Sequence, residues 1–365
     1  MRIFDTFPFD AELDLLEHRL AETYELVDVF VLVEAAQTFS GRPKELTFAR
    51  NRERFAWAAA KLRHITLDQL GGPERSPRER AAIQRDAVRL GLRDADPDDV
   101  VLLFDVDEIA SPSLLQRLRA EGIDAPRRVL MTRHYEHADA VAPRSPCCPV
   151  ATLPFQSATP YIAPGSWNVL DDTWHSASGV AVPFRALASR SAFDLRFSET
   201  DTTPIADGGR HFSSVDPSTQ LDRKLHRVFH TEWAGDRETN PAHLARCRSH
   251  GVHHRGWWYA ERPEGTPPDD VARLIARLGD RATFPPLRKR RLVRTWAWMR
   301  LHRAIPNRIV GMIDRHFERL LPLLALPLLI ADFVRYAASR MMKPRPDISL
   351  TNASTSRSHV ERSTA

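Results

Sequence analysis

Two aspartates follow a run of apolar residues in the sequence VVLLFDVDEI at 100–109. We expect 100–104 to form a buried strand. Side chains two positions apart at the end of a strand point the same way, so Asp105 and Asp107 should present their carboxylates together. Such hard oxygen ligands hold Mg²⁺ or Mn²⁺ and leave coordination sites for a diphosphate, whose charge the cation neutralises as a nucleotide departs. The alternative is a solvated acidic turn after a buried strand.

An aspartate pair after a strand also occurs in phosphatases of the haloacid dehalogenase type, in which the first aspartate is the nucleophile. Their motif continues into a Gly-Thr or Gly-Val turn and stands near the N-terminus. Here Glu108 and Ile109 follow the pair, more than a hundred residues into the chain. The sequence therefore favours a metal site over a nucleophilic Asp105.

A second polar cluster is DGGRHFSS at 207–214, with HTEW at 230–233 further along. The glycine pair permits close backbone approach. His211 has the chemistry of a metal ligand or a diphosphate contact, and Glu232 that of a general base. The chain has 15 histidines, so a surface or core role for His211 is the alternative.

Aromatic and cationic residues elsewhere suit a sugar or a phosphate. His134, Tyr135 and Trp174 offer ring faces with polar edges, which stack on sugar rings and equally suit a core. Arg85 is either a phosphate clamp or a surface residue of a helix.

The elements that must position these residues alternate between helices and strands. Spacing of apolar residues predicts them, in chain order, as helix 10–24 capped by Asp10, strand 27–35, helix 51–63, strand 65–67, helix 77–92 and strand 100–104. This alternation is typical of an α/β domain with a mostly parallel central sheet. Ligands of such sheets bind beyond the carboxyl ends of the strands, where Asp105 emerges.

Composition limits the classes of protein. The chain has 365 residues, of which 42% are hydrophobic and 27% charged, as in folded soluble domains. Its three cysteines cannot form a disulfide framework and indicate a reducing compartment. No secretory signal is visible at the N-terminus, so we expect a cytoplasmic protein.

Charge is divided unevenly along the chain. The net charge is +5, but segment 288–345 holds fourteen Lys and Arg against three acids. The remainder before it is therefore acidic, and binding of nucleic acid is not expected. Segment 288–345 combines these cations with tryptophans and an apolar run at 320–334. We expect a helical extension that lies on an anionic membrane surface or packs on the main domain. The last segment, 346–365, is expected to be a disordered tail.

Taken together, these motifs resemble glycosyltransferase family 17. The resemblance runs in order through IFDTFPFDAELDLLEHRL, VDVFVLVEAAQTFSGRPKELTF, NRERFA, QRDAVRLGL, DPDDVVLLFDVDEI and MTRHY, and resumes in DGGRHFSS and HTEW. It covers about 1–287, which we expect to be one domain. Two departures stand out: Arg210 replaces the tryptophan of the family's Gly-Trp-His, and 138–180 is expanded.

The resemblance implies a nucleotide-sugar-binding domain of the GT-A type and a metal-dependent inverting glycosyltransferase. It implies a UDP-sugar donor, UDP-N-acetylglucosamine by analogy, and a glycan or lipid-linked acceptor bound by the aromatic residues at 134, 135 and 174. The roles it implies for single residues are these: Asp105, Asp107 and His211 for Mn²⁺ or Mg²⁺; Glu34, Arg85 and Glu108 for the nucleotide sugar; Glu232 or Asp207 as base. The alternative is a non-catalytic sugar- or nucleotide-binding protein of the same fold.

Overall fold

The computed structural model describes residues 1–131, 133–137, 140–141, 167–168, 173–174, 176–197, 204–212 and 266–279, and positions 323, 327 and 330. Between 133 and 178 only the backbone is described.

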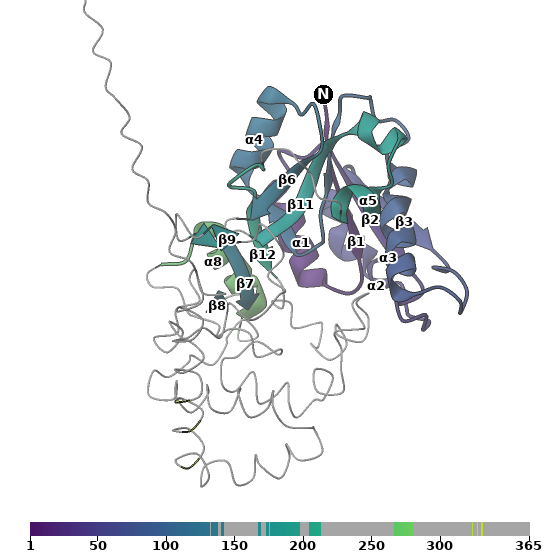
Figure 1. Ribbon diagram of the computed structural model, residues 1–365, viewed down its shortest axis with the longest axis horizontal. Coiled ribbons are helices and arrows are strands. Elements are labelled where there is room, and N and C mark those ends of the chain that lie inside the picture. The colour runs from purple at the N-terminus through teal and green to yellow at the C-terminus, as the bar shows by residue number, and fades with distance from the viewer. Residues whose placement is uncertain are drawn as a thin grey trace, which may run out of the picture.

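A six-stranded sheet forms the middle layer of the part of the chain that the structure describes (Figure 1). Its strands stand in the order β3 (Leu62–Leu67), β2 (Val29–Ala35), β1 (Ile3–Phe9), β4 (Val100–Leu103), β11 (Ser176–Pro183) and β6 (Arg127–Met131). The first four strands are parallel, and β11 is antiparallel to both of its neighbours. The predicted α/β class with a mostly parallel central sheet is confirmed.

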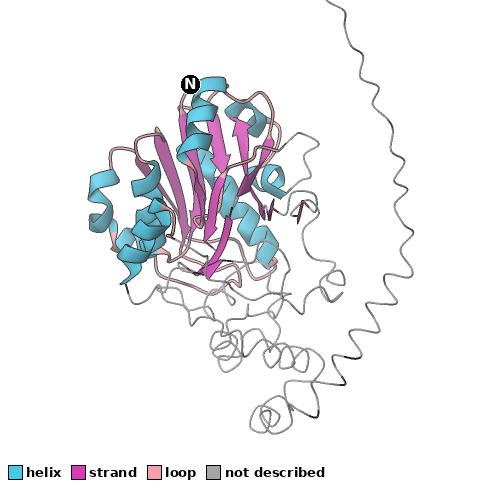
Figure 2. Cartoon of the chain, turned by 90° about the vertical axis from the view of Figure 1, so that its left-hand side faces the viewer, coloured by secondary structure: helices cyan, strands magenta, loops and turns pink. Residues whose placement is uncertain are grey.

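Helices lie on both faces of this sheet (Figure 2). They are α1 (Leu13–Thr23), α2 (Thr47–Arg50), α3 (Pro77–Asp86), α4 (Pro112–Glu121), α5 (Ala192–Phe197) and α8 (Asp269–Leu278), with the 3₁₀ helices η1 (Arg52–Ala58), η2 (Ala87–Gly91) and η3 (Phe184–Ala188). The sequence analysis expected longer helices at two of these places.

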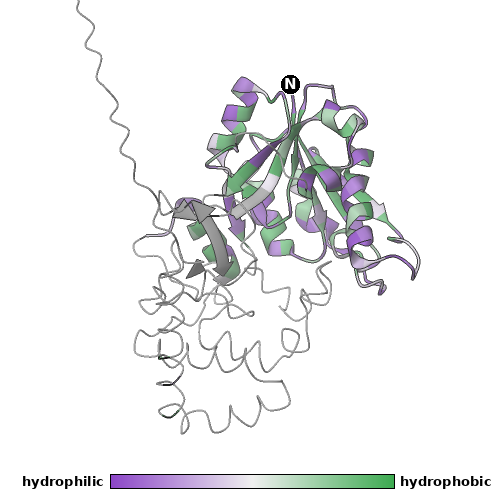
Figure 3. Cartoon of the chain, in the orientation of Figure 1, coloured by the Kyte–Doolittle hydropathy of each residue, from purple (hydrophilic) through white to green (hydrophobic). Residues whose placement is uncertain are grey.

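The core has two halves because the central strands are apolar on both sides. In β2, Phe30 and Leu32 pack with α1 and α4, whereas Val29, Val31 and Val33 pack toward η2 and α5. All seven residues of β2 are buried, as the run 27–35 predicts. Figure 3 shows the apolar colour concentrated along the sheet and the polar colour on the outer helices.

Two smaller sheets lie beside the central one. One has the order β5 (Glu108–Ala110), β12 (Gly209–Phe212), β7 (Arg133–His137) and β8 (Ala140–Val141). The other pairs β9 (Trp167–Asn168) with β10 (Thr173–Trp174). The first of them joins residues just after β4 to residues about a hundred positions later.

Helix boundaries differ from the expected ones. The helix expected at 51–63 is only the 3₁₀ turn η1, because the chain from Lys61 onward pairs with β2: the amide of Phe30 donates to the Lys61 carbonyl. Helix α1 begins at Leu13, so Asp10 is not its cap. The helix expected at 77–92 ends at Asp86 and tightens into η2, where Gly91 packs closely on Val31.

Helix α8 packs against α1 through a third apolar cluster. Leu274 and Val271 of α8 meet Leu15 of α1 and Phe212 of β12 there. Ion pairs join Arg273 and Arg277 of α8 to Glu22 and Glu17 of α1. Residues near 270 are thus part of the same unit as the first strands.

Among the described residues, no helix is long and apolar enough to cross a membrane. Apart from positions 323, 327 and 330, the extension at 288–345 and the tail at 346–365 lie outside the described residues.

Candidate functional site

The aspartate pair lies in a tight turn between β4 and β5. The sequence analysis placed Asp105 and Asp107 on the end of a strand, but β4 ends at Leu103 and the Glu108 amide closes the turn on the Asp105 carbonyl at 3.0 Å. The Asp105 side chain is 37% exposed and that of Asp107 13%. Both therefore reach solvent from an otherwise buried stretch of chain.

This turn forms one wall of a cavity of about 310 Å³ at the carboxyl ends of β1, β2 and β4. Its lining combines carboxylates, one lysine, one arginine, amides and several phenylalanines: Pro8, Phe9, Asp10, Glu12, Gln37, Thr38, Phe39, Lys44, Ala81, Gln84, Arg85, Asp105, Val106, Asp107, Phe193 and Phe197. The cavity thus lies beyond the carboxyl ends of the strands, where α/β proteins bind their ligands.

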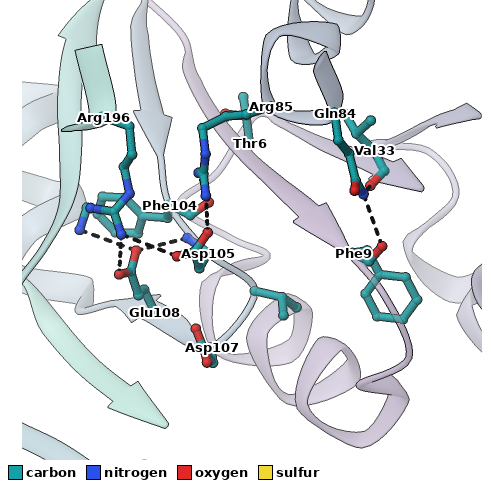
Figure 4. Close-up of polar contacts among 12 residues, drawn as sticks. Thr6, Phe9, Val33, Gln84, Arg85, Phe104, Asp105, Asp107, Glu108 and Arg196 are labelled. Atoms are coloured by element: carbon teal, nitrogen blue, oxygen red, sulfur yellow. Dashed lines mark hydrogen bonds and ion pairs between the residues drawn. The ribbon is translucent and has the colours of Figure 1, made fainter. Parts of the chain in front are cut away.

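Two arginines hold the Asp105 carboxylate. Arg85 of α3 pairs with Oδ1, and Arg196 of α5 donates to Oδ2 at 3.3 Å (Figure 4). Both arginine side chains are only 7% exposed. Burial raises the pKa of Asp105, but Arg85 and Arg196 outweigh it, so the pKa lies below its usual value and the carboxylate is charged.

Glu108 lies behind the turn and does not line the cavity. Its Oε1 accepts from Arg196 at 2.5 Å, and its Oε2 accepts from the amides of Asp105 at 2.8 Å and Gly179 at 3.2 Å. A Cβ at position 179 would meet the Phe104 ring at 2.1 Å, which explains the glycine. Burial raises the pKa of Glu108. Glu108 thus supports Asp105 from within the core.

His211 is brought to Asp107 by strand β12. His211 pairs with Glu108 of β5, and the amide of Phe212 donates to the Asp107 carbonyl at 2.7 Å. His211 Nε2 then lies 3.6 Å from Asp107 Oδ1. Gly209 makes this pairing possible, because it has φ 133° and a Cβ there would lie 1.9 Å from the Ile109 carbonyl oxygen.

Arg210, where the resemblance has tryptophan, points to α8. Its guanidinium pairs with both carboxylate oxygens of Asp270. The substitution therefore contributes to the docking of α8 on β12.

Two of the three residues expected to hold a metal, Asp105 and Asp107, line the cavity. Asp105 and Asp107 offer carboxylate oxygens at the cavity, and His211 lies beside Asp107. Within the described ranges no three His, Cys, Asp or Glu side chains are grouped as a metal site. Carboxylate oxygens are ligands of the kind that Mg²⁺ takes together with phosphate and water, but both oxygens of Asp105 also accept from Arg85 and Arg196, so a cation would bind beside these arginines.

Two expected site residues have other surroundings. Glu34 is fully buried, and its carboxylate accepts from the amides of Phe48 and Ala49 and contacts His64 Nε2 at 3.2 Å. This differs from the expected contact with a nucleotide: Glu34 fixes α2 to the sheet. Asp207 is exposed with φ 54° and does not line the cavity.

The remaining expected site residues are described in part or not at all. Arg85 lines the cavity, and its expected contact with a phosphate stays a prediction. His134 and Tyr135 lie in β7, where they pair with His211 and Phe212, and Trp174 lies in β10; their side chains are outside the described residues. Glu232 lies outside the described residues altogether.

Sequence reasoning missed three residues that the fold brings to the turn or the cavity. Arg196 pairs with Asp105 across ninety positions, and Gln84 donates to the carbonyls of Phe9 and Val33 at 3.3 and 2.8 Å (Figure 4). Arg19 is fully buried beneath the turn. For Arg19 a signal existed, because an arginine on the apolar face of an amphipathic helix needs a buried partner.

Comparison with models of protein families gives a match. The model of glycosyltransferase family 17 matches residues 1–137, which include the cavity walls from β1, β2, α3 and the 105–107 turn. A search of curated proteins found no match. The family match confirms the resemblance over 1–137 and supports a glycosyltransferase as the class of enzyme.

Proposed function

We propose that this chain, with its family-17 glycosyltransferase segment at 1–137, transfers N-acetylglucosamine from a UDP-sugar to a hydroxyl of a glycan or lipid-linked acceptor. A glycosyltransferase needs a sugar donor and an acceptor. The UDP-sugar, the identity of the sugar, the inverting course and the cation are parts of the proposal.

One observation supports this proposal most: at the carboxyl ends of the strands, the cavity combines phenylalanine side chains with the charged turn at 105–107. Phe39, Phe193 and Phe197 suit the flat face of a nucleobase, and the turn with Arg85 suits the charge of a diphosphate. A cavity of about 310 Å³ is within the usual size of small-ligand sites.

Asp105, Asp107 and His211 are the residues that would hold Mn²⁺ or Mg²⁺, which when bound stabilises the negative charge of the leaving diphosphate. Arg85 and Arg196 keep Asp105 ionised and fixed in place. Glu108 in turn orients the Asp105 backbone from behind. These contacts are made by the chain itself, so they would reduce the cost of ordering Asp105 when a ligand binds.

The proposed transfer is a direct displacement. A carboxylate takes the proton of the acceptor hydroxyl, the acceptor oxygen forms a bond to the anomeric carbon, and the bond from that carbon to the diphosphate breaks. Glu232 is the first candidate for the base and Asp207 the second. Glu232→Gln keeps the shape and removes the basicity, so kcat should fall while UDP affinity holds; poor UDP binding by this variant would make Glu232 a binding residue instead.

Release of UDP from UDP-sugars by the full-length protein tests the proposal. We expect release from UDP-N-acetylglucosamine that depends on Mn²⁺ or Mg²⁺ and that falls on the order of 10²-fold or more in Asp107→Asn. Asp98→Asn is the control, because Asp98 is 82% exposed and lies just before the amino end of β4, whereas the aspartate turn at 105–107 follows its carboxyl end. Release that is unchanged after removal of divalent cations contradicts the metal site.

The cellular setting belongs to the same proposal. A cytoplasmic enzyme whose segment 288–345 binds the anionic inner face of the membrane would meet a lipid-linked acceptor there. Flotation with anionic liposomes at low and high salt, for the full chain and for a chain ending at 287, tests this. A full-length protein that ignores such liposomes at low salt contradicts it.

A further inference from the structure

Arg19 is hydrogen-bonded to the turn at 105–108 that carries Asp105 and Asp107. Its guanidinium is fully buried between β1 and the turn. On one side Nε and Nη2 donate to the carboxylate of Asp5, which is 1% exposed. The guanidinium also lies over the Phe7 ring, 4.4 Å from its centroid.

The third guanidinium nitrogen of Arg19, Nη1, donates to carbonyls of the turn. Nη1 donates to the carbonyls of Asp105 at 2.9 Å, Val106 at 3.2 Å and Glu108 at 2.6 Å. Three carbonyls of four consecutive residues therefore converge on one buried nitrogen. Such a convergence fixes the peptide planes that flank Asp105 and Asp107, and with them the directions of both side chains.

We propose that Arg19 is a positioning residue: it holds the 105–108 turn in the conformation that presents Asp105 and Asp107 to the donor diphosphate. The inference rests on the proposed function for its catalytic consequence. Its structural consequence, the rigidity of the turn, stands independently of which ligand binds.

A general structural role would predict something different. Asp5 and Phe7 link Arg19 to β1, so a general role would spread any damage over the central sheet. A positioning role confines the damage to the turn. Displacing catalytic groups by about 1 Å costs on the order of 10²-fold in rate, even when the fold is intact.

Two variants separate these cases. Arg19→Lys keeps the positive charge but has one nitrogen in place of three, so it cannot donate both to the Asp5 carboxylate and to the three carbonyls of the turn. Asp5→Asn/Arg19→Gln removes both charges together, so that no unpaired charge remains buried. Arg54→Lys is the matched control, because Arg54 also pairs with α1, at Asp14 and Glu17, and does not contact the turn.

Three quantities are measured on each variant: amide hydrogen exchange, UDP affinity in the presence of Mn²⁺, and kcat/KM for release of UDP from a UDP-sugar. We expect exchange at Asp105 and Glu108, whose amides are bonded within the turn, to rise at least tenfold in both Arg19 variants, with β1 and β2 unchanged. We expect UDP affinity to fall at least tenfold and kcat/KM on the order of 10²-fold. Arg54→Lys should match the wild type in all three.

The proposal is overturned if either Arg19 variant folds with wild-type exchange in the turn and wild-type UDP affinity. It is also overturned if neither variant folds, because Arg19 then supports the whole sheet. If the wild type itself neither binds UDP nor releases it from UDP-sugars, the proposed function fails, and the exchange rates of the turn still decide the role of Arg19.

Discussion

At the scale of single residues, the site depends on charges that are balanced in pairs. Asp105 is held by two arginines that are almost fully buried, and Glu108 shares one of them. Removing the carboxylate would leave two guanidinium groups facing one another without their common partner. Asp105 is therefore important for stability as well as for ligand binding.

We predict that Asp105→Asn lowers the free energy of unfolding at pH 7 by about 1–3 kcal/mol, the usual cost of losing hydrogen bonds to charged groups. Asp98→Asn should change it by less than about 0.5 kcal/mol, because that pair is exposed. Urea unfolding of both variants and the wild type measures the difference. An Asp105→Asn protein as stable as the wild type would show that Arg85 and Arg196 need no anion here.

At the scale of elements, the contact of α1 with α8 buries a histidine. His18 of α1 is 1% exposed, and its ring meets Phe212 edge-on at 6.0 Å. Among the described residues neither ring nitrogen has a hydrogen-bond partner, and Glu22 Oε1 lies 3.7 Å from Nδ1. Burial lowers the pKa of His18 to about 4, against opposition from Glu22.

We predict that this interface loses stability in mild acid. In the unfolded chain His18 takes up a proton below about pH 6.5, whereas in the folded protein it does so only near pH 4. The free energy of unfolding therefore falls as the pH decreases from about 6.5 to about 4. The contribution is about 3 kcal/mol at most. Urea unfolding at several pH values for the wild type and His18→Phe measures it. Parallel pH profiles for the two proteins would contradict the prediction.

The pairing of β5 with β12 depends on one glycine. We predict that Gly209→Ala destabilises the protein by about 1–3 kcal/mol. The backbone angle φ of 133° is strained for any residue with a Cβ, and that Cβ would also clash with the Ile109 carbonyl oxygen. Gly41→Ala is the comparison: φ is 84° there, but the nearest atoms belong to the flexible Arg80 side chain at 3.1 Å. Thermal unfolding should rank Gly209→Ala as the less stable variant, and the reverse order would contradict the account of β12.

At the scale of the whole molecule, the part of the chain that builds the cavity extends beyond the segment that matches the family. Residues 1–137 supply most of the cavity lining, yet Phe193 and Phe197 of the lining come from α5. Arg196, which pairs with Asp105, also comes from α5. Strand β12 and helix α8 then hold His211 against the turn. A site assembled in this way requires the later segments to fold with the first ones.

We predict that a chain ending at 287 remains folded and keeps donor binding, whereas a chain ending at 265 loses stability. The shorter chain lacks α8, so Leu15, Ile109 and Phe212 lose the apolar cover of Leu274 and Val271. Burying large apolar side chains contributes about 1.5–3 kcal/mol each. Thermal unfolding of the two truncated proteins tests this, and equal melting temperatures would contradict it.

The sequence by itself determined three strands of the central sheet, β2, part of β3 and β4, and their order along the chain. The apolar runs that became β2 and β4 are local patterns, and a strand buried on both faces can be recognised from its own residues. Alternation with helices then gave the α/β class. The sequence also identified Asp105, Asp107 and Arg85, all of which line the cavity.

Only the tertiary structure decided what each polar residue contacts. Leu62 to Leu67 became a strand because β2 offered its edge, overriding the helical spacing before it. Glu34 and Glu108 turned inward to backbone amides and an arginine, while Arg19 and Arg196 were brought to the turn from 86 and 91 positions away. Periodicity records which side of an element is apolar. The partner of a buried charge depends on how elements that are distant in the sequence pack together. A local pattern of residues contains no information about that packing.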